Sequence, residues 1–568
     1  MLSDQGDGVG GRAELTERVR DGTLRLHGGE LLAHPATLPA MLDDAARRAP
    51  DRAFLVERDA RRRWRQIGFA TAAKRSRRVA AALRALGASE TRPVMILTGN
   101  GIDHALLTLG AAHAAIPVAP IAAALGLDAR DDFARLRAIA AVVRPAVVFA
   151  RDGAAYADAV RAAAPEAAFV SVGAPPSGIR SFDYARLLAH APLPDGDVVV
   201  DGETVAKLMF GSDPSGESAA VVVTHGMIGA MLQGLAQAWP FLERHPPVIV
   251  DAQPWSGAFG GNVVLGIALR HAGTLHVDDG EPTAQHLART ARLRAEIAPT
   301  LAFDLPSGWA RWVEHLRADD ALRRRWLTRL DRACWSGSTM APSTCDALRA
   351  IGVPLAAIWG STETAGASCV TGGVDPKFDA IGAPLAGVDL TLLPVGAAYE
   401  MRVRGPQVTT GYYWRPDLTA TVFDEEGSMR TGDVVRPVDA RAPERDLEYV
   451  ARLDRRFKLS SGTWVRAEEL QAAFLAECSD AADVLATGQG GDQVGLLVYP
   501  TPDATLLDRD VLRAQIADAM RRVATGGGAA GSPRRALIVG APPARLPRAA
   551  AYVARLQASE PDAEVIVL

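Results

Sequence analysis

The sequence predicts an α/β protein with more than one domain, and three observations indicate this. Segments rich in alanine carry arginines at helical spacing, as in residues 69–86, and they alternate with short apolar runs. Apolar runs such as 93–97 and 146–150 are bounded by turn residues, which is typical of short strands buried between helices. With 568 residues, 48% of them hydrophobic, the chain is long enough to form more than one core.

Three regions follow one another along the chain. Residues 1–30 are rich in glycine and charge, so we expect a flexible lead-in, and they lack the apolar core of a secretory signal. Residues 31–453 make up the expected large domain, because the charged cluster 452–456 follows a strand-like run and marks a domain joint. Residues 454–568 make up a smaller α/β domain. Its expected strands are 494–499 and 536–539, and its expected flexible loop is 526–533.

Composition excludes several classes of protein. The 62 Lys and Arg residues nearly balance the 66 Asp and Glu residues, giving a net charge of -4, so nothing indicates a nucleic-acid binder. The cysteines are sparse and show no CxxC spacing, which indicates neither a disulfide framework nor a zinc site. We therefore expect a reducing, cytoplasmic compartment and a monomer or homodimer. The four cysteines are Cys334, Cys345, Cys369 and Cys478.

The stretch 105–127 is apolar except for His113 and is long enough to raise the question of a membrane span. Pro117 and Pro120 interrupt any helix there and remove backbone donors. The stretch therefore predicts a buried helix followed by a strand, and no association with a membrane.

Three short motifs occur in a fixed order and fit the activation of a carboxylic acid by ATP. Glu363 beside Thr362 suits a magnesium ion and a phosphate oxygen, because Mg²⁺ prefers carboxylate and phosphate oxygens. Asp433, which follows Gly432, has two oxygens that could accept both ribose hydroxyl hydrogens. Alone, each motif is more often a helix cap or a turn, so their joint order carries the prediction. The motifs are Trp359-Gly-Ser-Thr-Glu-Thr364, Arg430-Thr-Gly-Asp433 and the stretch from Arg452 to Val465.

A loop rich in serine and glycine precedes a valine-rich strand within residues 209–225, and most such loops bind nothing. Together with the three motifs, it resembles the phosphate loop of the adenylate-forming ligases, where backbone N–H groups and hydroxyls wrap the phosphates. The positions that match are Ser212, Ser215 and Gly216. The family's lysine falls on Ala219, and one of its glycines falls on Asp213.

A narrower resemblance covers residues 23–500, which are similar to the feruloyl-CoA synthetase branch of the acyl-CoA ligases. It implies a large N-terminal domain of stacked sheets and helices, followed by a small mobile domain that swings about Asp454. It also implies ATP, Mg²⁺ and coenzyme A as ligands and an aromatic carboxylic acid as substrate. The stretches that carry it are 92–100, 253–262, 273–283 and 457–465.

The same resemblance implies roles for single residues. Thr362, Glu363 and Lys458 would be catalytic, with Glu363 holding the metal and Lys458 serving the thioester-forming orientation. Asp433 and Arg452 would hold the ribose. The other nucleotide-binding positions would be Ser336, Gly337, Trp359, Gly360 and Ser361, with Trp359 against adenine. The acid pocket would be bordered by Trp255, Gly257, Phe259, Gly260 and Asn262. Without the resemblance, Trp255 and Phe259 would be expected in the core, and Arg452 and Lys458 on the surface.

Cationic positions of the family are missing here. Lysine occurs only at Lys74, Lys207, Lys377 and Lys458, so no lysine follows residue 458. The segment that bears the family's adenylation lysine is shortened to residues 544–548, and Arg545 or Arg548 is a poor substitute because a guanidinium needs different surroundings. Losing two preorganised donors would slow adenylation by roughly 10⁴ to 10⁶. Gly257 also stands where relatives have a histidine.

Two hypotheses follow from these observations. The first is an ATP-dependent acid:CoA ligase that activates a hydroxycinnamate-like acid through an acyl-adenylate and then forms a CoA thioester. The second is a catalytically impaired relative that binds a nucleotide or acyl ligand in a biosynthetic or regulatory role. An oxidoreductase of the Rossmann type is excluded, because no GxGxxG opens a helix after a strand.

Overall fold

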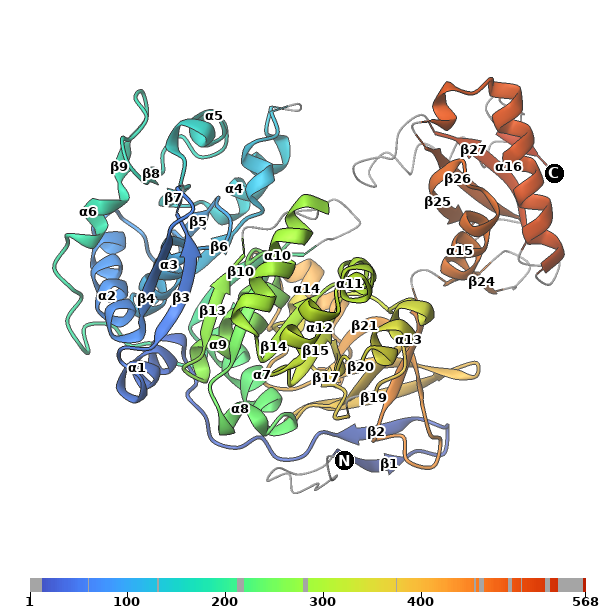
Figure 1. Cartoon of the computed structure of the whole chain (residues 1–568), viewed down its shortest axis with the longest axis horizontal. Helices are drawn as coiled ribbons and strands as arrows, with labels where there is room; N and C mark the ends of the chain where they lie inside the picture. Colours follow the sequence, from blue (N-terminus) through green and yellow to red (C-terminus); the bar gives the residue numbers. More distant parts are fainter. Residues whose placement is uncertain are drawn as a thin grey trace.

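The computed structural model shows an α/β protein with a large unit of two extended sheets and a smaller C-terminal unit, drawn in orange and red at one side of the molecule (Figure 1). This confirms the predicted fold class. The large unit carries the candidate site residues up to Arg452. The described residues are 13–59, 61–129, 132–211, 219–278, 284–373, 375–453, 456–458, 464–488, 493–501, 503–526, 532–539 and 565–567.

The first sheet has seven strands in the order β11-β10-β6-β5-β7-β8-β9, all parallel except the antiparallel pair β10 and β11. Its central strands are buried over their full length, which explains their uninterrupted apolar sequences. The strands expected at 93–97 and 146–150 are β5 and β7, so both predictions are confirmed. The bounds are β5 Val94–Ile96, β6 Val118–Pro120, β7 Val147–Phe149, β8 Ala168–Ser171, β9 Ser181–Asp183, β10 Val205–Phe210 and β11 Ala220–Thr224.

The second sheet has fifteen strands, and one end of it is a parallel run in the order β16-β15-β14-β12-β13-β3. Strand β4 closes this end as an antiparallel neighbour of β3. The parallel run matters for function because the carboxyl ends of its strands meet at one edge. The bounds are β3 Ala53–Arg58, β4 Trp64–Gly68, β12 Val248–Asp251, β13 Thr274–Val277, β14 Leu301–Asp304, β15 Arg332–Trp335 and β16 Leu355–Trp359.

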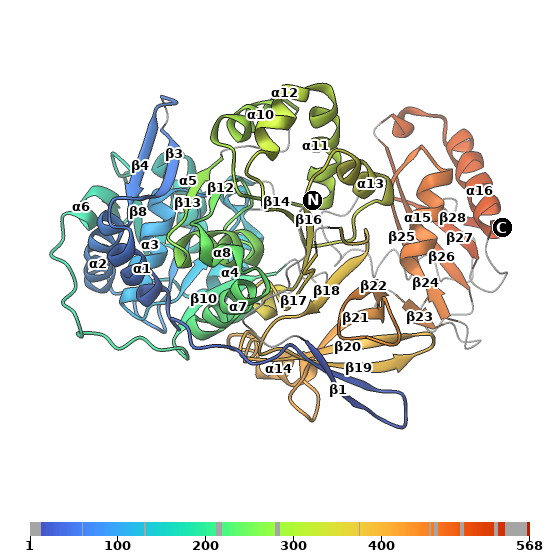
Figure 2. The ribbon, with the colours of Figure 1, turned by 60° about the horizontal axis from the view of Figure 1, so that its bottom comes forward.

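The other end of the second sheet is antiparallel and includes a hairpin from the N-terminal region. Strands β1 and β2 pair with each other, and β2 pairs with β19. The hairpin therefore lies along the edge of the sheet, where Figure 2 shows β1 near β19. Gly22 turns between them with a φ of 93°, a conformation that favours glycine. The bounds are β1 Glu14–Arg18, β2 Leu24–His27, β17 Cys369–Val370, β18 Ala380–Pro384, β19 Asp389–Val395, β20 Ala398–Arg404, β21 Met429–Pro437 and β22 Leu447–Arg452.

The expectation of a flexible lead-in over residues 1–30 is therefore wrong for residues 14–27. Leu24 and Leu26 lie one period of the strand apart, point to the same face, and are each 1% exposed in the core. A strand this short gives a weak signal in the sequence, and its burial depends on β19, which lies far along the chain. Residues 1–12 lie outside the described residues.

Helices cover the sheets of the large unit. The helix predicted over 69–86 is α2, and the buried helix predicted at the start of 105–127 is α3, all of whose residues are buried. Strand β6 follows it as predicted. Among the described helices, none combines the length and apolar character needed to cross a membrane. The bounds are α1 Leu38–Arg48, α2 Phe69–Ala85, α3 Ile102–His113, α4 Ala134–Val143, α5 Gly153–Ala163, α6 Tyr184–Leu188, α7 His225–Ala238, α8 Phe241–Arg244, α9 Leu265–Arg270, α10 Ala284–Ile297, α11 Pro306–Ala318, α12 Asp320–Leu327, α13 Pro342–Ala350 and α14 Pro416–Val422, with a π-helix at Phe259–Val264 and short 3-10 turns at Ala123–Gly126 and Thr362–Thr364.

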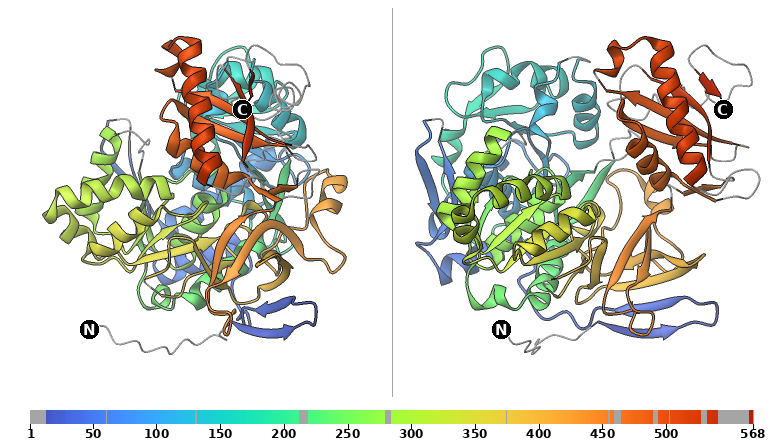
Figure 3. Two further views of the ribbon diagram at one scale, coloured as in Figure 1. Left: turned by 90° about the vertical axis from the view of Figure 1, so that its right-hand side faces the viewer. Right: turned by 45° about the vertical axis from the view of Figure 1, so that its right-hand side comes forward.

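The C-terminal unit has a core of its own, in which α15 and α16 pack against a four-stranded sheet ordered β25-β26-β27-β28 (Figure 3). The strands expected at 494–499 and 536–539 are β26 and β27. The predicted boundary at residue 454 and most of the predicted loop at 526–533 lie outside the described residues. The bounds are β23 Arg456–Lys458, β24 Trp464–Arg466, α15 Ala467–Glu477, β25 Ala481–Thr487, β26 Val494–Pro500, a 3-10 turn at Ala504–Leu506, α16 Arg509–Gly526, β27 Pro533–Ile538 and β28 Val565–Val567.

The burial of the N-terminal hairpin predicts a stability effect. Leu26→Ala should lower the free energy of unfolding by about 3 kcal/mol, because it removes a fully buried side chain and leaves a cavity. Leu32→Ala is the matched control, since Leu32 is 40% exposed. The urea midpoint of the large unit reports both variants. Equal midpoints for the two would contradict the packing of this hairpin.

Candidate active site

Three segments with predicted site residues meet at the carboxyl edge of the parallel run. Strands β16, β15, β14 and β12 are consecutive neighbours in the sheet and run parallel. Gly360 and Ser361 follow β16, Ser336 and Gly337 follow β15, and the segment 252–258 follows β12. Ligands of open α/β sheets bind at such an edge. The fold thus brings together residues that are far apart in the sequence.

The turn after β16 is shaped by close backbone contacts. A Cβ on Gly360 would lie 2.5 Å from the carbonyl oxygen of Gly366, so a side chain does not fit there. Ser361 precedes the turn Thr362–Thr364, and its backbone N–H donates to the hydroxyl of Thr364 at 2.9 Å. The backbone N–H of Thr409 donates to the carbonyl of Glu363 at 2.7 Å. These contacts fix the direction in which Thr362 and Glu363 leave the backbone.

Glu363 lies beside the strand that follows the predicted phosphate loop. Its Oε1 accepts a hydrogen bond from the hydroxyl of Tyr412 at 3.0 Å, and Tyr412 pairs with Val221 of β11. At the other end of the loop, a Cβ on Gly211 would lie 3.8 Å from the hydroxyl oxygen of Thr362. Gly211 and β11, which flank residues 212–218 in the sequence, therefore both lie next to the Thr362–Thr364 turn. The loop positions Ser212, Ser215 and Gly216 lie outside the described residues.

Asp433 forms hydrogen bonds with three residues, two of which donate to its carboxylate. Trp359 at the end of β16 donates its Nε1–H to Oδ2 at 2.9 Å, and Arg452 donates from Nη1 to Oδ1 at 3.3 Å. The backbone N–H of Asp433 donates to the hydroxyl of Thr431 at 3.0 Å. Asp433 and Arg452 stand directly opposite on β21 and β22. The sequence assigned Trp359 to adenine, and the structure adds that its N–H orients this carboxylate.

The segment 252–258 is anchored by polar contacts on both sides. The amide of Asn100 donates to the carbonyl of Gln253 at 2.8 Å and accepts from the backbone N–H of Trp255 at 2.9 Å. Asp251 accepts from the backbone N–H of Gln253 at 2.8 Å, and its burial raises the pKa of its carboxyl to about 7. Sequence reasoning missed Asn100, although it lies in one of the stretches that carry the family resemblance.

The π-helix Phe259–Val264 forms a second wall next to this segment. Cβ atoms on Gly260 and Gly261 would overlap the carbonyls of Gln253 and Trp255, so glycine allows the two backbones to touch. Phe259 meets Phe303 of β14 edge to face at 5.8 Å, and Trp255, which is 2% exposed, packs against His104. Short stretches of π-helix occur frequently at functional sites.

Asn262 connects this wall to the turn that bears Glu363. Its Nδ2 donates to the carbonyl of Ala365 at 3.1 Å, and within the described part of the chain its buried Oδ1 has no partner. Gly257 has room around it, since an added Cβ would meet only the carbonyl oxygen of Pro254 at 3.5 Å. The predicted acid-pocket residues thus lie together, and Asn262 joins them to the predicted catalytic turn.

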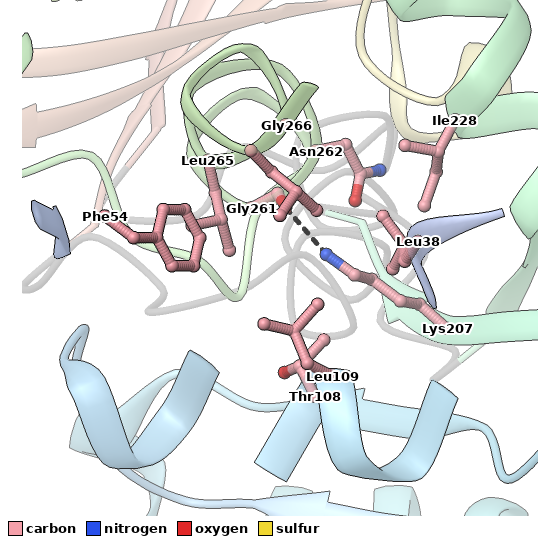
Figure 4. A pocket seen from close by; sticks show the side chains of 11 residues that line it. Leu38, Phe54, Thr108, Leu109, Lys207, Ile228, Gly261, Asn262, Leu265 and Gly266 are labelled. Atoms are coloured by element: carbon pink, nitrogen blue, oxygen red, sulfur yellow. Dashed lines mark hydrogen bonds between the residues drawn. The ribbon is translucent and has the colours of Figure 1, made fainter. Parts of the chain in front are cut away.

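Lys207 on β10 is a buried lysine that sequence reasoning did not assign. It is 3% exposed, and its Nζ donates to the carbonyl of Gly261 at 2.7 Å (Figure 4). Burial lowers the pKa of its ammonium to about 7, because a charged group is poorly solvated in this apolar setting. Burial, aided by the charge of Lys207, also lowers the pKa of His104 to about 4 and of His225 to about 3. A lone lysine in the apolar strand Val205–Phe210 was the available signal.

The remaining predicted residues belong to the C-terminal unit. Lys458 ends β23 and pairs with Trp464 of β24 in the backbone register. The predicted hinge Asp454 and the tail arginines Arg545 and Arg548 lie outside the described residues. Within the described residues, no three His, Cys, Asp or Glu side chains gather as a metal cage.

Comparison with known proteins identifies the family. The AMP-binding enzyme family matches residues 42–413, which is more than half of the chain. The chain belongs to this family. Its fold is that of the adenylate-forming ligases, and it is similar to ATP-bound chimera B3 of RpMatB and BxBclM, with a TM-score of 0.69, 19% identity, and coverage of 89% of this chain and 95% of that chain. The anthranilate CoA ligase AuaEII, in complex with anthranoyl-AMP, gives a TM-score of 0.68 at 16% identity over 92% of this chain and 97% of its own.

Curated relatives of this AMP-binding chain are much longer proteins. CymA of Salinispora arenicola, a probable nonribosomal peptide synthetase, is 30% identical over 383 residues, which are 62% of this chain and 5% of CymA. A carboxylic acid reductase of Segniliparus rugosus is 34% identical over 128 residues, which are 22% of this chain and 10% of the reductase. The chain therefore spans a small fraction of the length of the curated relatives it matches.

The three-way hold on Asp433 predicts a nucleotide-binding effect. Trp359→Phe keeps an aromatic ring but removes the N–H donor, so we expect the dissociation constant for ATP to rise about tenfold, as for loss of one bond to a charged group. Titration calorimetry with ATP measures it. Trp414→Phe is the control, because Trp414 is 63% exposed. Unchanged ATP affinity in Trp359→Phe would show that this hydrogen bond is not needed.

The buried ammonium of Lys207 predicts a pH-dependent stability difference. In the unfolded chain its pKa is about 10.4, so between pH 7 and that value the unfolded state binds more protons and stability rises with pH. Below pH 7 the full cost of burying the charge remains. The Lys207→Met variant has no charge to bury at this position. The free energy of unfolding of the variant minus that of the native chain should therefore fall by roughly 2–3 kcal/mol from pH 6 to pH 9.

Urea unfolding at the two pH values tests this prediction. His104 and His225, which lie near Lys207, have pKa values of about 4 and about 3 and so stay neutral throughout. Lys74→Met is the control, because Lys74 is exposed on α2. A pH-independent difference between Lys207→Met and the native chain would contradict a buried, depressed ammonium.

Proposed function

We propose that this chain is an acid–thiol ligase of the feruloyl-CoA synthetase type. It activates an aromatic, hydroxycinnamate-like carboxylic acid with ATP and passes the acyl group to the thiol of coenzyme A. The observation that carries the proposal is the placement of Asp433 against Trp359, at the end of the same strand that leads to Glu363. One carboxylate suits a ribose and the other suits a metal-bound triphosphate, so together they describe a nucleotide in one orientation.

In the first step, the acid carboxylate attacks the α-phosphorus of ATP, and pyrophosphate leaves. Asp433 accepts hydrogen bonds from the ribose hydroxyls, while Arg452 keeps that carboxylate oriented. Thr362 offers its hydroxyl to a phosphate oxygen at the end of the phosphate loop. Glu363 would hold Mg²⁺, which would supply positive charge to offset that of the triphosphate. The protein's contribution is positioning and electrostatic stabilisation.

In this proposal the acid lies beside the segment 252–258 and the π-helix, whose backbones touch. Trp255 and Phe259 supply aromatic surface, which suits a planar ring. Asn262 is one residue from the carbonyl that Lys207 holds. Its Oδ1, which has no partner among the residues that the structure describes, is available to a polar substituent. The space around Gly257 admits a larger acid than a histidine at this position would allow.

In the second step, coenzyme A attacks the acyl-adenylate and releases AMP. The small C-terminal unit reorients about Asp454, so that Lys458 on β23 reaches the site in the thioester-forming orientation. When this unit reorients, a different set of its residues faces the adenylate. The thiol of a carrier protein is the other acceptor chemistry, since a relative named as a long-chain-fatty-acid–[acyl-carrier-protein] ligase is among the matches.

A specific observation favours a second candidate function. Ala219 stands at the end of the phosphate loop, where the family has a lysine, and is 8% exposed. No ammonium from this position can neutralise the triphosphate. In this second proposal, the chain binds a nucleotide or acyl ligand but forms the adenylate slowly, with a biosynthetic or regulatory role.

ATP–pyrophosphate exchange across a panel of aromatic acids separates the two candidates. We expect exchange that requires a hydroxycinnamate such as ferulate and that falls strongly in Glu363→Gln, which keeps the shape of the side chain but removes its charge. Thioester formation with coenzyme A is then measured for the best acid. Absence of exchange with every acid at high enzyme concentration would end the ligase proposal and leave the second candidate.

The position of Ala219 gives a direct prediction. Ala219→Lys should raise the exchange rate by roughly a hundredfold to a thousandfold, because it restores one preorganised cation at the phosphates. Ala185→Lys is the control, since it adds a lysine at an exposed position on α6. An unchanged rate in Ala219→Lys would show that the loop is not the limiting defect and would point to the shortened segment 544–548.

A further inference from the structure

Strand β10 meets the π-helix through two side chains on one of its faces. Lys207 donates to the carbonyl of Gly261 at 2.7 Å, and the sulfur of Met209 accepts from Nδ2 of Asn262 at 3.4 Å. Residues two apart in a strand point to the same side, so both contacts follow from one orientation of β10. The strand ends at Phe210, immediately before the predicted phosphate loop. It thus connects the wall of the acid pocket to the triphosphate site.

The apolar surroundings of Lys207 do not compensate for the free energy lost when its ammonium is removed from water. Its Nζ lies in a cavity of about 10 Å³, which is about the space that one water molecule needs. Burial is the cause of its pKa shift, and the structure gives the ammonium one hydrogen bond among the described residues, to Gly261. Figure 4 shows the apolar side chains that face it. They include Leu38, Phe54, Leu109, Ile228 and Leu265.

The acceptor of this bond is a backbone group with neighbours in the site. On one side of Gly261, Gly260 touches the carbonyl of Gln253, and on the other side Asn262 donates to the carbonyl of Ala365 at 3.1 Å. Gly261 itself packs against the backbone of Trp255. A displacement of the Gly261 peptide therefore moves the wall that faces the acid. The turn that carries Glu363 keeps hydrogen bonds of its own, from the backbone N–H of Thr409 to the carbonyl of Glu363 and from the backbone N–H of Ser361 to the hydroxyl of Thr364.

We propose that Lys207 is a positioning residue for the acid pocket. Its ammonium holds the Gly261 carbonyl, and through it fixes the π-helix against the segment 252–258. Lys207 does not touch the substrate. This inference rests on the proposed function, because it assigns the pocket beside the π-helix to the carboxylic acid.

The position of β10 itself does not depend on this bond. Backbone pairing with β11 on one side and β6 on the other keeps the strand in the sheet. Removing the ammonium should therefore disturb the π-helix and leave the start of the phosphate loop in place. A loss confined to the acid, with ATP binding preserved, is the signature of this arrangement.

Lys207→Met in the full chain tests the inference, since methionine fills the cavity without a donor or a charge. We expect the KM for ferulate in the exchange assay, and its dissociation constant by calorimetry, to rise about tenfold, as for loss of one bond to a charged group. The KM for ATP and the urea midpoint should not worsen. Lys74→Met, at an exposed position, should match the native chain in every measurement.

The outcomes separate this inference from the proposed function. Unchanged ferulate affinity in Lys207→Met overturns the inference, and so does a parallel loss of ATP affinity or a lowered urea midpoint, because both indicate a general structural role. A native chain without exchange ends the ligase proposal alone. In that case weaker ferulate binding in Lys207→Met still supports the positioning role, while equal binding, or none in either protein, overturns it.

Discussion

The hydrogen bond from Trp359 Nε1 to Asp433 Oδ2 joins the parallel and the antiparallel parts of the fifteen-stranded sheet at the site. Trp359 ends a strand of the parallel run, and Asp433 lies in the antiparallel part. Arg452 approaches the same carboxylate from the neighbouring strand. Because Trp359 also precedes the turn with Glu363, this one contact sets the placement of the two carboxylates that a nucleotide would need. The rest of the site is arranged around that placement.

The acid side of the site is built by close approach of backbones. Gly260, Gly261 and Gly366 stand where a Cβ would meet a carbonyl or a packed side chain, so three chain segments lie against one another with little space between them. Hydrogen bonds from Asn100, Asn262 and Lys207 then hold these segments in one relative position, because hydrogen bonds are directional and apolar packing is not. A buried charge that costs stability is understandable in such a place, because function and stability are often in conflict at active sites.

We propose that the site has carboxylates without the matching cation. Tyr412 donates to Glu363, and two donors contact the side chain of Asp433. The sequence resemblance assigns the family's phosphate-loop lysine to Ala219, which is 8% exposed. A site of this kind can select and orient a nucleotide while giving weak stabilisation to the charge that develops on its phosphates. We therefore expect this chain to bind a nucleotide well but to form the adenylate slowly.

The sequence by itself determined the α/β class, the strands β5, β7, β26 and β27, and the helices α2 and α3, because their apolar periodicities are local properties of the chain. It also indicated Glu363 and Asp433, since short motifs keep their residue types together. Only the tertiary structure decided that residues 14–27 join the large sheet, that Trp359 holds Asp433, and that Lys207 reaches Gly261. Each of these depends on partners distant in sequence, and the free energy of burial that fixes them exists only once the segments meet.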